Sequence, residues 1–408
     1  MRPADLDPAA VAATSLPGRS EPLRVVFLAD QLTGKGMEET WGALIERLNP
    51  ARFDVEICSL GRLGVVGERL ARRFPATSPL RRHACDARGL ARLARHLRGR
   101  ADAVVTLGGS GPMWWGVAAA RWSKIPVALS LLDEANGAET LGFADRVVAR
   151  WSDGIVVPTE AGRRRLVDER RLPTASVHMI APGVDTDRFN FRPADAFQVR
   201  QQLEIPERAA LCGLLTSADA TTARQMLDGV RRVAFSASAT RFVIWGPASL
   251  SLNWSAWISA AGLQDRVFVL DDHDNWKAAL SAMQVLACWG ATPSLRLLEA
   301  MAAQVPIVAT DHDGIQGLVQ PGCHGYLVES QDLRAWASLT IQLLQDASLA
   351  RGLGECGRQH VVKYGSIDVM VRRYEQLIYE THQRKRSGPG AADAATLVDG
   401  VEFCGAAP

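Results

Sequence analysis

Glu299 is the carboxylate whose sequence surroundings best fit a hydroxyl-binding site. It precedes the small and apolar run Ala300–Ala303, and the apolar stretch Val305–Ala309 follows. A carboxylate at the start of a helix can accept hydrogen bonds from sugar or ribose hydroxyls. The same pattern fits a helix packed by Leu298 and Met301, in which Glu299 only stabilises the helix dipole. From the residues alone, both interpretations stay open.

A second candidate is the glycine-bearing loop Asp30–Glu39, which follows the apolar run Leu23–Ala29. Its glycines let the backbone approach a ligand, and a helix beginning near Met37 favours an anion at its amino terminus. A plain tight turn explains the loop equally well.

The stretch from Arg62 to Arg100 concentrates positive charge. It holds eleven arginines against two acids, Glu68 and Asp86, a local net charge of +9, whereas the chain has 46 Lys and Arg against 44 Asp and Glu. The small global charge does not indicate a nucleic-acid partner. The arginines either line the solvated outer face of a packed helix or attract an anionic lipid or a phosphorylated acceptor.

The spacing of the cysteines and histidines gives little support for a metal site or a disulfide. The seven cysteines are widely separated, without Cys-x-x-Cys, and predict a reduced, cytosolic chain. None of the eight histidines has metal-ligand spacing, and Asp271–Asp274, which includes His273, fits a strand end and helix cap better than a metal site. The eleven tryptophans can stack on sugars, although packing explains them without a ligand.

Short apolar runs alternate with segments of helical length, the rhythm of parallel β-α-β units. Six buried strands are expected before Pro193: Leu23–Ala29, Phe53–Ser59, Ala103–Leu107, Pro126–Leu131, Gly154–Val157 and Val177–Ile180. Six more are expected after it: Ala209–Leu215, Arg241–Trp245, Val267–Leu270, Gln284–Cys288, Pro306–Ala309 and Gly325–Val328. The fold class is therefore α/β, with two halves.

These patterns predict the domain organisation. We expect disordered tails at 1–22 and 386–408, an N-terminal domain at 23–190, a C-terminal domain at 191–365, and a helix at 366–385 that packs back on the N-terminal domain. Three long uncharged stretches are interrupted by Gly, Pro or Asn, so none predicts a membrane span, and the amino terminus has no secretion signal. Ligands of parallel sheets bind at the carboxyl ends of the strands.

Several motifs together resemble a known family. Leu297–Asp311 (LLEAMAAQVPIVATD), Gly322–Val328 (GCHGYLV) and Ala181–Phe189 (APGVDTDRF) are collinear with Lys35–Glu38 (KGME) near the amino terminus and Gly262–Val267 (GLQDRV). This set is similar to the family-four (group 1) retaining, nucleotide-sugar-dependent glycosyltransferases, over roughly residues 23 to 380. The resemblance implies two Rossmann-like domains facing across a cleft, the GT-B architecture.

The resemblance implies an enzyme of the hexosyltransferase type, which moves a sugar from a nucleotide-diphosphate donor to a glycan or glycolipid acceptor. It places Glu299 on the ribose hydroxyls and the amides around Leu295, Leu297 and Leu298 near the diphosphate. Gly36 and Glu38 lie on the acceptor side. No cofactor and no obligate metal are implied, so cations and backbone amides must hold the departing diphosphate.

The chain departs from the family at its catalytic cations. Leu214 or Leu215 stands where the family has an arginine, no lysine follows nearby, and Arg224 offers the next cation. Arg224 and Arg296 are therefore the candidate replacements.

Two further catalytic positions are altered. Ala291 stands eight residues before Glu299, in place of the family's first glutamate, and Ser130–Asp133 contains no histidine, which leaves Asp133 as the substitute. The alternative function is a catalytically degenerate relative that binds a nucleotide, glycan or protein without turnover. The expected location is cytoplasmic, with peripheral contact at the inner face of the cell membrane through the Arg62–Arg100 region.

Overall fold

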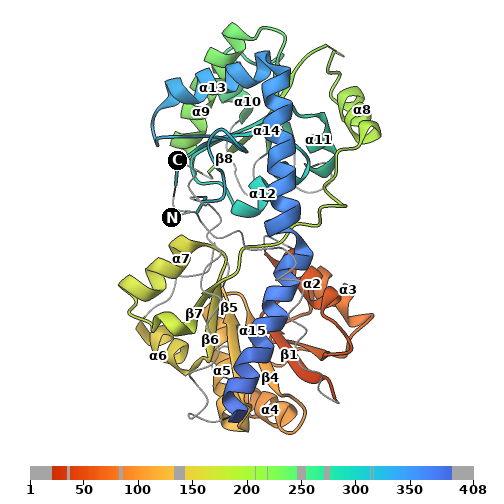
Figure 1. Ribbon diagram of the computed structural model, residues 1–408, viewed down its shortest axis with the longest axis vertical. Coiled ribbons are helices and arrows are strands. Elements are labelled where there is room, and N and C mark those ends of the chain that lie inside the picture. Colours follow the sequence, from red (N-terminus) through yellow and green to blue (C-terminus); the bar gives the residue numbers. More distant parts are fainter. Residues whose placement is uncertain are drawn as a thin grey trace, which may run out of the picture. The chain divides into compact units, whose positions relative to one another are not determined.

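The computed structural model describes residues 21–34, 37–81, 86–132, 143–206, 208–217, 219–245, 254–270, 276–312, 314–315 and 317–387. The chain divides into two compact units, one formed by Met1–Pro182 with Ile367–Pro408 and the other by Gly183–Ser366. We call them unit 1 and unit 2 (Figure 1). Of the predicted disordered tails, residues 1–20 and 388–408 lie outside the described residues.

Unit 1 is built on a parallel sheet. Among the described residues its strands are β1 (Leu23–Ala29), β2 (Phe53–Ser59), β3 (Ala76–Thr77), β4 (Ala103–Leu107), β5 (Val127–Leu131), β6 (Gly154–Val157) and β7 (Val177–Met179), in the spatial order β3-β2-β1-β4-β5-β6-β7. Phe27 in β1 lies between Ile57 in β2 and Val105 in β4. Because helices cover both faces, the central strands are continuous apolar runs.

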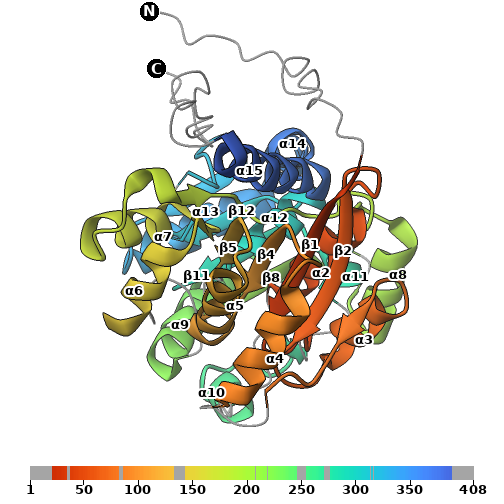
Figure 2. The same ribbon diagram turned by 90° about the horizontal axis from the view of Figure 1, so that it is seen from below.

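The helices of unit 1 form two layers. One face is covered by α4 (Ala87–Leu97), α5 (Ser110–Ser123), α6 (Phe143–Trp151), α7 (Glu160–Arg164) and the π-helix η1 (Arg165–Glu169). The other is covered by α2 (Glu38–Arg47), α3 (Gly64–Ala71) and α15 (Ile367–Ser387). Figure 2 shows α4 and α5 in front of the central strands. The short 3-10 helix η2 (Thr174–Ser176) precedes β7.

The last helix, α15, belongs to unit 1 although the whole of unit 2 precedes it in the chain. Met370, Tyr374 and Ile378 are buried in the core shared with β1 and α2, and the Arg47 guanidinium pairs with Asp368 at 3.0 Å. The helix continues to Ser387, so residues 386 and 387, which the sequence assigned to a tail, are helical.

Unit 2 is also built on a parallel sheet. Its strands are β8 (Leu211–Thr216), β9 (Arg241–Trp245), β10 (Val267–Leu270), β11 (Val285–Trp289), β12 (Ile307–Thr310) and β13 (Gly325–Val328), in the spatial order β10-β9-β8-β11-β12-β13. Its helices are α8 (Pro193–Gln202), α9 (Ala220–Ser236), α10 (Trp254–Ala260), α11 (Trp276–Ala282), α12 (Ser294–Ala302), α13 (Leu333–Gln345), α14 (Ala347–His360) and the π-helix η3 (Val361–Gly365).

The strands match the twelve sequence expectations to within two residues at either end. Only β3, two residues long, was not expected, because so short an edge strand has no periodicity to detect. The boundary between the units falls after Pro182, whereas the sequence placed it at 190. In both sheets the strand order reverses beside the first strand, between β1 and β4 and between β8 and β11. The carboxyl ends of these strands are the positions at which such sheets bind ligands.

Candidate functional site

In the candidate site of unit 2, the loop that follows β11 packs against the residues that follow β8. Gly290, just after β11, has a φ of +84°, and a Cβ there would lie 2.6 Å from Thr222 Cγ2 and 2.8 Å from Ser217 Oγ. Only glycine combines this backbone conformation with this close approach. The two loops are therefore held together at the reversal point of the sheet.

Buried polar atoms without partners lie at this same edge. Thr216 Oγ1, at the end of β8, and Asp311 Oδ1, directly after β12, make no hydrogen bond with any residue that the structure describes. Buried polar groups are almost always satisfied, so these two oxygens at the ligand-binding edge of one sheet are candidates for contact with a ligand.

Glu299 lies on α12 and is held by two side chains. Its Oε2 accepts hydrogen bonds from Trp276 Nε1 on α11 at 2.7 Å and from Arg296 Nη1, one helical turn earlier, at 3.2 Å. The Arg296 guanidinium also covers the Trp276 ring, 4.9 Å from its centroid. Glu299 is 7% exposed, and these two partners hold its carboxylate in one orientation.

Burial shifts the titration of this carboxyl. Desolvation raises the pKa of Glu299, while Arg296, the Trp276 hydrogen bond and Arg188 act in the opposite direction. Burial dominates because it penalises the charged form more than these partners favour it. Glu299 therefore takes up a proton at a higher pH than an exposed glutamate does.

The amides at the start of α12 can serve an anion only in part. The helix begins at Ser294 after Pro293, which makes no side-chain cap, and the Arg296 N–H already donates to Pro293 O at 3.0 Å. The amides of Leu297 and Leu298 lie inside the helical hydrogen-bond ladder, and both side chains are fully buried. Of the predicted leucines, Leu295 alone has its amide in the first turn, and the placement of the three leucines near the diphosphate stays a prediction.

Arg224 lies in the second turn of α9, behind the cap that Asp219 forms by accepting from Thr222 N at 2.8 Å. Its guanidinium lies over the Trp257 ring of α10, 4.7 Å from the centroid. The two candidate cations thus have different partners: Arg296 contacts Glu299, and Arg224 stacks on an aromatic face.

In unit 1, Glu38 organises the loop after β1. Its Oε2 accepts from Gly34 N at 2.7 Å and from Thr33 Oγ1 at 2.9 Å. Gly34 has a φ of +94°, so the carboxylate holds a backbone that other residues rarely adopt. The predicted residues Gly36 and Asp133 lie outside the described residues, as does the Asp271–Asp274 cluster.

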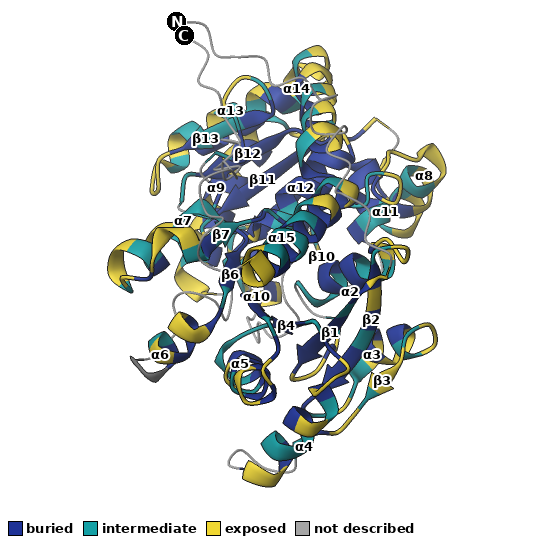
Figure 3. Cartoon of the chain, turned by 60° about the horizontal axis from the view of Figure 1, so that its bottom comes forward, coloured by how far each residue is buried: buried dark blue, intermediate teal, exposed yellow. Residues whose placement is uncertain are grey.

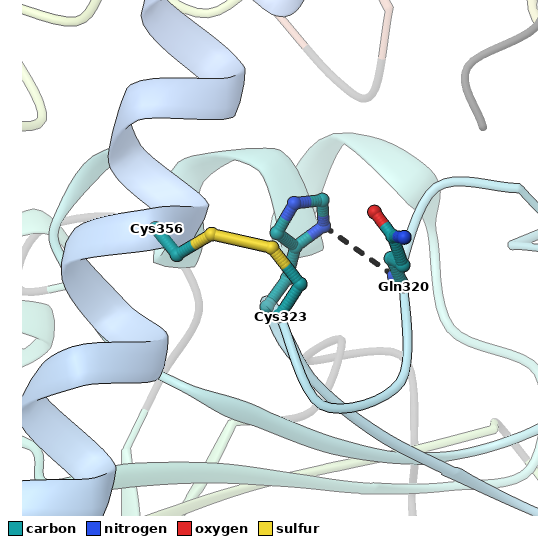
Figure 4. The surroundings of a disulfide bond; sticks show 4 residues. Gln320, Cys323 and Cys356 are labelled. Carbon is teal, nitrogen blue, oxygen red and sulfur yellow. Dashed lines mark hydrogen bonds between the residues drawn. A yellow bond between two sulfur atoms is a disulfide. The ribbon is translucent and has the colours of Figure 1, made fainter. Parts of the chain in front are cut away.

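The prediction of an entirely reduced chain is wrong, because Cys323 and Cys356 form a disulfide (Figure 4). It joins the loop before β13 to α14. His324, beside Cys323, accepts from Gln320 N at 3.4 Å, and burial lowers the pKa of its imidazole. Although these three side chains have metal-ligand spacing, the two sulfurs bond to each other, so the cluster is a covalent link.

A second group with ligand spacing is Glu56, Cys58 and His96 in unit 1. His96 Nε2 pairs with Glu56 Oε1, and burial raises the pKa of the Cys58 thiol, which keeps it protonated. A protonated thiol is a poor metal ligand. Sequence spacing did not indicate either group, because each combines residues from separate elements.

Removing the disulfide should destabilise the protein. The bond closes a loop with a sequence separation of 33, so Cys356→Ser should lower the free energy of unfolding by about 3 kcal/mol through the entropy of the unfolded chain. Thermal denaturation measures the change. A reductant should lower the melting temperature of the unmodified protein but not that of the variant. Equal melting of the unmodified protein with and without reductant would contradict the prediction.

Sequence reasoning missed three contributors to the site: Trp276, Thr216 and Asp311. Trp276 was one of eleven tryptophans with no feature to distinguish it, and it reaches Glu299 only through the packing of α11 against α12. Thr216 directly follows the expected strand Ala209–Leu215, and Asp311 lies two residues after the expected strand Pro306–Ala309, so the strand-end rule could have singled them out.

Comparison with known families matches both units. A model described as Glycosyltransferase Family 4 matches residues 34–188, and one described as Glycosyl transferases group 1 matches residues 209–346. Within the described residues, no helix is long and apolar enough to cross a membrane.

Curated relatives are similar over part of their length. The chain is 35% identical over 128 residues to N-acetyl-alpha-D-glucosaminyl L-malate synthase of Bacillus anthracis, covering 31% of this chain and 34% of the relative. It is 28% identical over 266 residues to the GDP-mannose-dependent alpha-(1-6)-phosphatidylinositol monomannoside mannosyltransferase of Mycobacterium tuberculosis, covering 62% of this chain and 65% of the relative. The chain therefore spans less than two thirds of either relative.

Solved structures share the fold. HepE of Anabaena, in complex with UDP and glucose, has a TM-score of 0.73 at 15% identity and covers 88% of this chain and 100% of that one. A glycosyltransferase from Rickettsia africae has a TM-score of 0.74 at 15% identity, covering 88% and 98%. The expected α/β class with two Rossmann-like units, of the GT-B type, is confirmed.

Proposed function

Because the chain belongs to the group 1, family 4 glycosyltransferases, we propose that it transfers a hexose-type sugar, with retention of configuration, from a nucleotide-diphosphate donor to a hydroxyl of a glycan or glycolipid. Unit 2 takes the donor and unit 1 the acceptor. A structural neighbour solved with UDP and glucose and a relative named as a mannosyltransferase support this class of reaction.

The observation that carries the proposal is the held carboxylate of Glu299 in unit 2. Its Oε2 takes the bonds from Trp276 and Arg296, which leaves Oε1 as the oxygen for the ribose hydroxyls. A carboxylate that is already oriented loses little entropy when it binds. Arg296 opposes the rise that burial causes in the pKa of Glu299, and a charged acceptor forms the stronger hydrogen bond.

For catalysis, the protein must also stabilise the negative charge on the departing diphosphate. The family's arginine, lysine and first glutamate are replaced here by Leu214 or Leu215, by no nearby lysine, and by Ala291. Losing one transition-state donor costs about 10² to 10³ in rate. We therefore expect turnover to be slow, with Arg224 as the main remaining cation and the Leu295 amide near the diphosphate. No metal is required in this proposal, so transfer should persist in a chelator.

The deciding experiment is a screen of UDP-, GDP- and ADP-sugars by thermal shift, followed by measurement of nucleotide release. A donor that raises the melting temperature and is then slowly cleaved agrees with the proposal. Binding without any release would show a protein that binds a donor and does not turn it over. If no donor binds, nucleotide-sugar chemistry is excluded.

The acceptor loop supplies a separate prediction. Glu38→Ala removes the acceptor of two hydrogen bonds, from Thr33 and Gly34, and should release the loop after β1. We expect transfer to the acceptor to fall about tenfold, whereas hydrolysis of the donor, bound in unit 2, should not change. Glu46→Gln on the same helix is the control. A parallel loss of hydrolysis and transfer would contradict the assignment of this loop to the acceptor.

A lipid-linked acceptor would bring unit 1 to a membrane through the Arg62–Arg100 region, and the arginines there differ in their partners. Three of them pair with acids: Arg69 with Glu39 and Glu46, Arg81 with Asp30, and Arg92 with Asp86. Others are exposed, namely Arg62, Arg72, Arg73, Arg88, Arg95, Arg98 and Arg100. Arg82 lies outside the described residues. The exposed set supports contact with an anionic surface.

A further inference from the structure

Four side chains of the types that bind metals lie where the loop before β13 meets α14 in unit 2. Cys323 and His324 are neighbours in the loop, and Cys356 and His360 lie on the helix. One ligand atom from each of Cys323, His324 and Cys356 lies within 4.8 Å of the others. The imidazole rings of His324 and His360 have their centroids 4.4 Å apart. We call these four residues the Cys–His cluster.

The helix and the loop each present two members of the cluster to the same place. Cys356 and His360 are four residues apart on α14, so their side chains lie on one face of the helix. Two ligands at this spacing are common in structural zinc sites. Neither pair alone makes a site, and the fold brings the two pairs together across a sequence separation of 33 between the cysteines.

The backbone holds the ring of His324 in place. This side chain is buried, Gln320 N donates to its Nδ1 at 3.4 Å, and the Leu318 backbone also makes a hydrogen bond with the ring. Histidines that bind metals are usually fixed in this way through the ring nitrogen that does not touch the metal. The contact with Gln320 therefore leaves Nε2 of His324 as the nitrogen for a metal.

The disulfide closes the cluster in the structure, but a small reductant can reach its sulfurs. Cys323 and Cys356 are both partly exposed, and Figure 3 shows α14 with exposed as well as buried residues. A thiol reductant attacks one sulfur, which breaks the S–S bond and forms a mixed disulfide. A second thiol group then releases this cysteine. The protein gains two electrons and two protons as two thiols, and the reductant leaves as its own disulfide.

We propose that the reduced Cys–His cluster binds one zinc ion, with Cys323, His324, Cys356 and His360 as its four ligands. The ion replaces the protons of the two thiols, which go to solvent. Two sulfur and two nitrogen ligands favour zinc, whereas magnesium and calcium prefer oxygen. With Zn–N bonds of about 2.0 Å and Zn–S bonds of about 2.3 Å, tetrahedral ligand atoms lie about 3.3 to 3.8 Å apart. Small side-chain movements bring the opened cluster to this size.

The zinc ion keeps the loop before β13 attached to α14 when the disulfide is open. This attachment matters to unit 2 because α14 packs closely on the end of α12. Gly354 lies against Gln304 O, where a Cβ would clash, and Arg358 Nη1 donates to Ala302 O. The site goes beyond the proposed function, since the ion is structural and takes no part in sugar transfer.

The experiment compares the reduced and oxidised forms of the full chain, each freed of metal with a chelator. A dithiol reduces the protein and is removed without air before Co²⁺ is added as the probe. Thiolates bound to cobalt absorb in the near ultraviolet, and tetrahedral cobalt absorbs strongly in the visible. We expect one equivalent of Co²⁺ to give both absorptions in the reduced protein and neither in the oxidised protein. Zn²⁺ should displace the cobalt and remove the colour, because its d shell is full.

Thermal melting gives a second readout of the same site. In the metal-free protein, the reductant alone should lower the melting temperature, because it opens the disulfide. One equivalent of Zn²⁺ should raise it again in the reduced protein, since a ligand that binds only the folded state stabilises that state. The oxidised protein should not respond to Zn²⁺.

Variants assign the ligands, and thermal melting first shows that each variant is folded. Cys323→Ser and Cys356→Ser should abolish the near-ultraviolet absorption of the cobalt form. His360→Gln keeps both cysteines, and therefore the disulfide, and should lower the affinity of the reduced protein for Zn²⁺ at least about tenfold. The matched control is Cys58→Ser in the other group with ligand spacing, which should bind cobalt as the unmodified reduced protein does.

Three results would overturn the proposal: no cobalt binding by the reduced protein, the same absorption in the oxidised protein, or loss of the absorption in Cys58→Ser alone. Unchanged zinc affinity in His360→Gln would overturn the four-ligand site. The measurements use the metal without any sugar donor, so each of these results would leave the proposed transfer reaction intact.

Discussion

Glu299→Gln should weaken the affinity for the best-binding nucleoside diphosphate about 10- to 100-fold, because a neutral amide replaces the charged acceptor of the ribose hydroxyls. The substitution keeps the size of the side chain and one oxygen for Trp276 Nε1, which donates to Oε2 in the structure. Loss of affinity should therefore exceed any loss of stability. Calorimetry gives the dissociation constant, and thermal melting gives the stability.

The matched control is Glu355→Gln, an exposed glutamate on α14 of the same unit. It removes the same charge from unit 2 without touching the site. If Glu299→Gln and the control bind the nucleotide with the affinity of the unmodified protein, Glu299 does not contact the ribose.

The pH dependence of binding provides an independent readout. Burial raises the pKa of Glu299, so the folded protein retains this proton at pH values where an unfolded chain has lost it. The contribution of Glu299 to the free energy of unfolding should therefore fall as pH rises from the ordinary glutamate range through the raised pKa. Nucleotide affinity should rise over the same pH range, because binding needs the ionised carboxylate. Trp276→Phe should move this step to higher pH, and Glu299→Gln should abolish it.

Arg224→Gln should lower the rate of donor cleavage about 10² to 10³-fold, the usual cost of removing one group that stabilises a developing charge. Arg224 stacks on Trp257 in the absence of a donor. An exposed cation–π contact is worth only about 0.5 to 1 kcal/mol, so a diphosphate can draw the guanidinium away at small cost. Single-turnover release of the nucleotide measures the effect.

Arg231→Gln, two turns further along α9 and also exposed, is the control for the loss of a positive charge from this helix. We expect Arg224→Gln to affect cleavage more than affinity for the nucleoside without its phosphates. Unchanged cleavage in Arg224→Gln would leave the diphosphate to Arg296 and the Leu295 amide. It would then follow that Arg296 serves the carboxylate and the phosphate together.

The strands were predictable because each is a local pattern. A strand in a parallel sheet is covered on both faces, so its residues are continuously apolar whichever neighbours they meet. Leu23–Ala29 and Phe53–Ser59 therefore have the same bounds in the sequence analysis and in the structure. The sequence analysis placed Glu299 at the start of a helix, whereas it lies well inside α12, which begins at Ser294.

Other features depended on contacts between distant residues. Trp276 and Glu299 are 23 residues apart, and the disulfide joins Cys323 to Cys356 across a separation of 33. No local pattern encodes either contact, because each depends on how two helices or a loop and a helix pack. The sequence analysis interpreted all the cysteines as reduced because their spacing could not show that Cys323 and Cys356 lie together.

The sequence by itself determined the α/β class, the strands of both units and the family, since these follow from apolar runs and from motifs that are contiguous in the chain. Only the tertiary structure decided which side chains hold Glu299 and that the buried oxygens of Thr216 and Asp311 lack hydrogen-bond partners among the described residues. The physical reason is that burial and hydrogen bonding are properties of the packed chain. A residue's type limits the partners it can have, and packing selects among them.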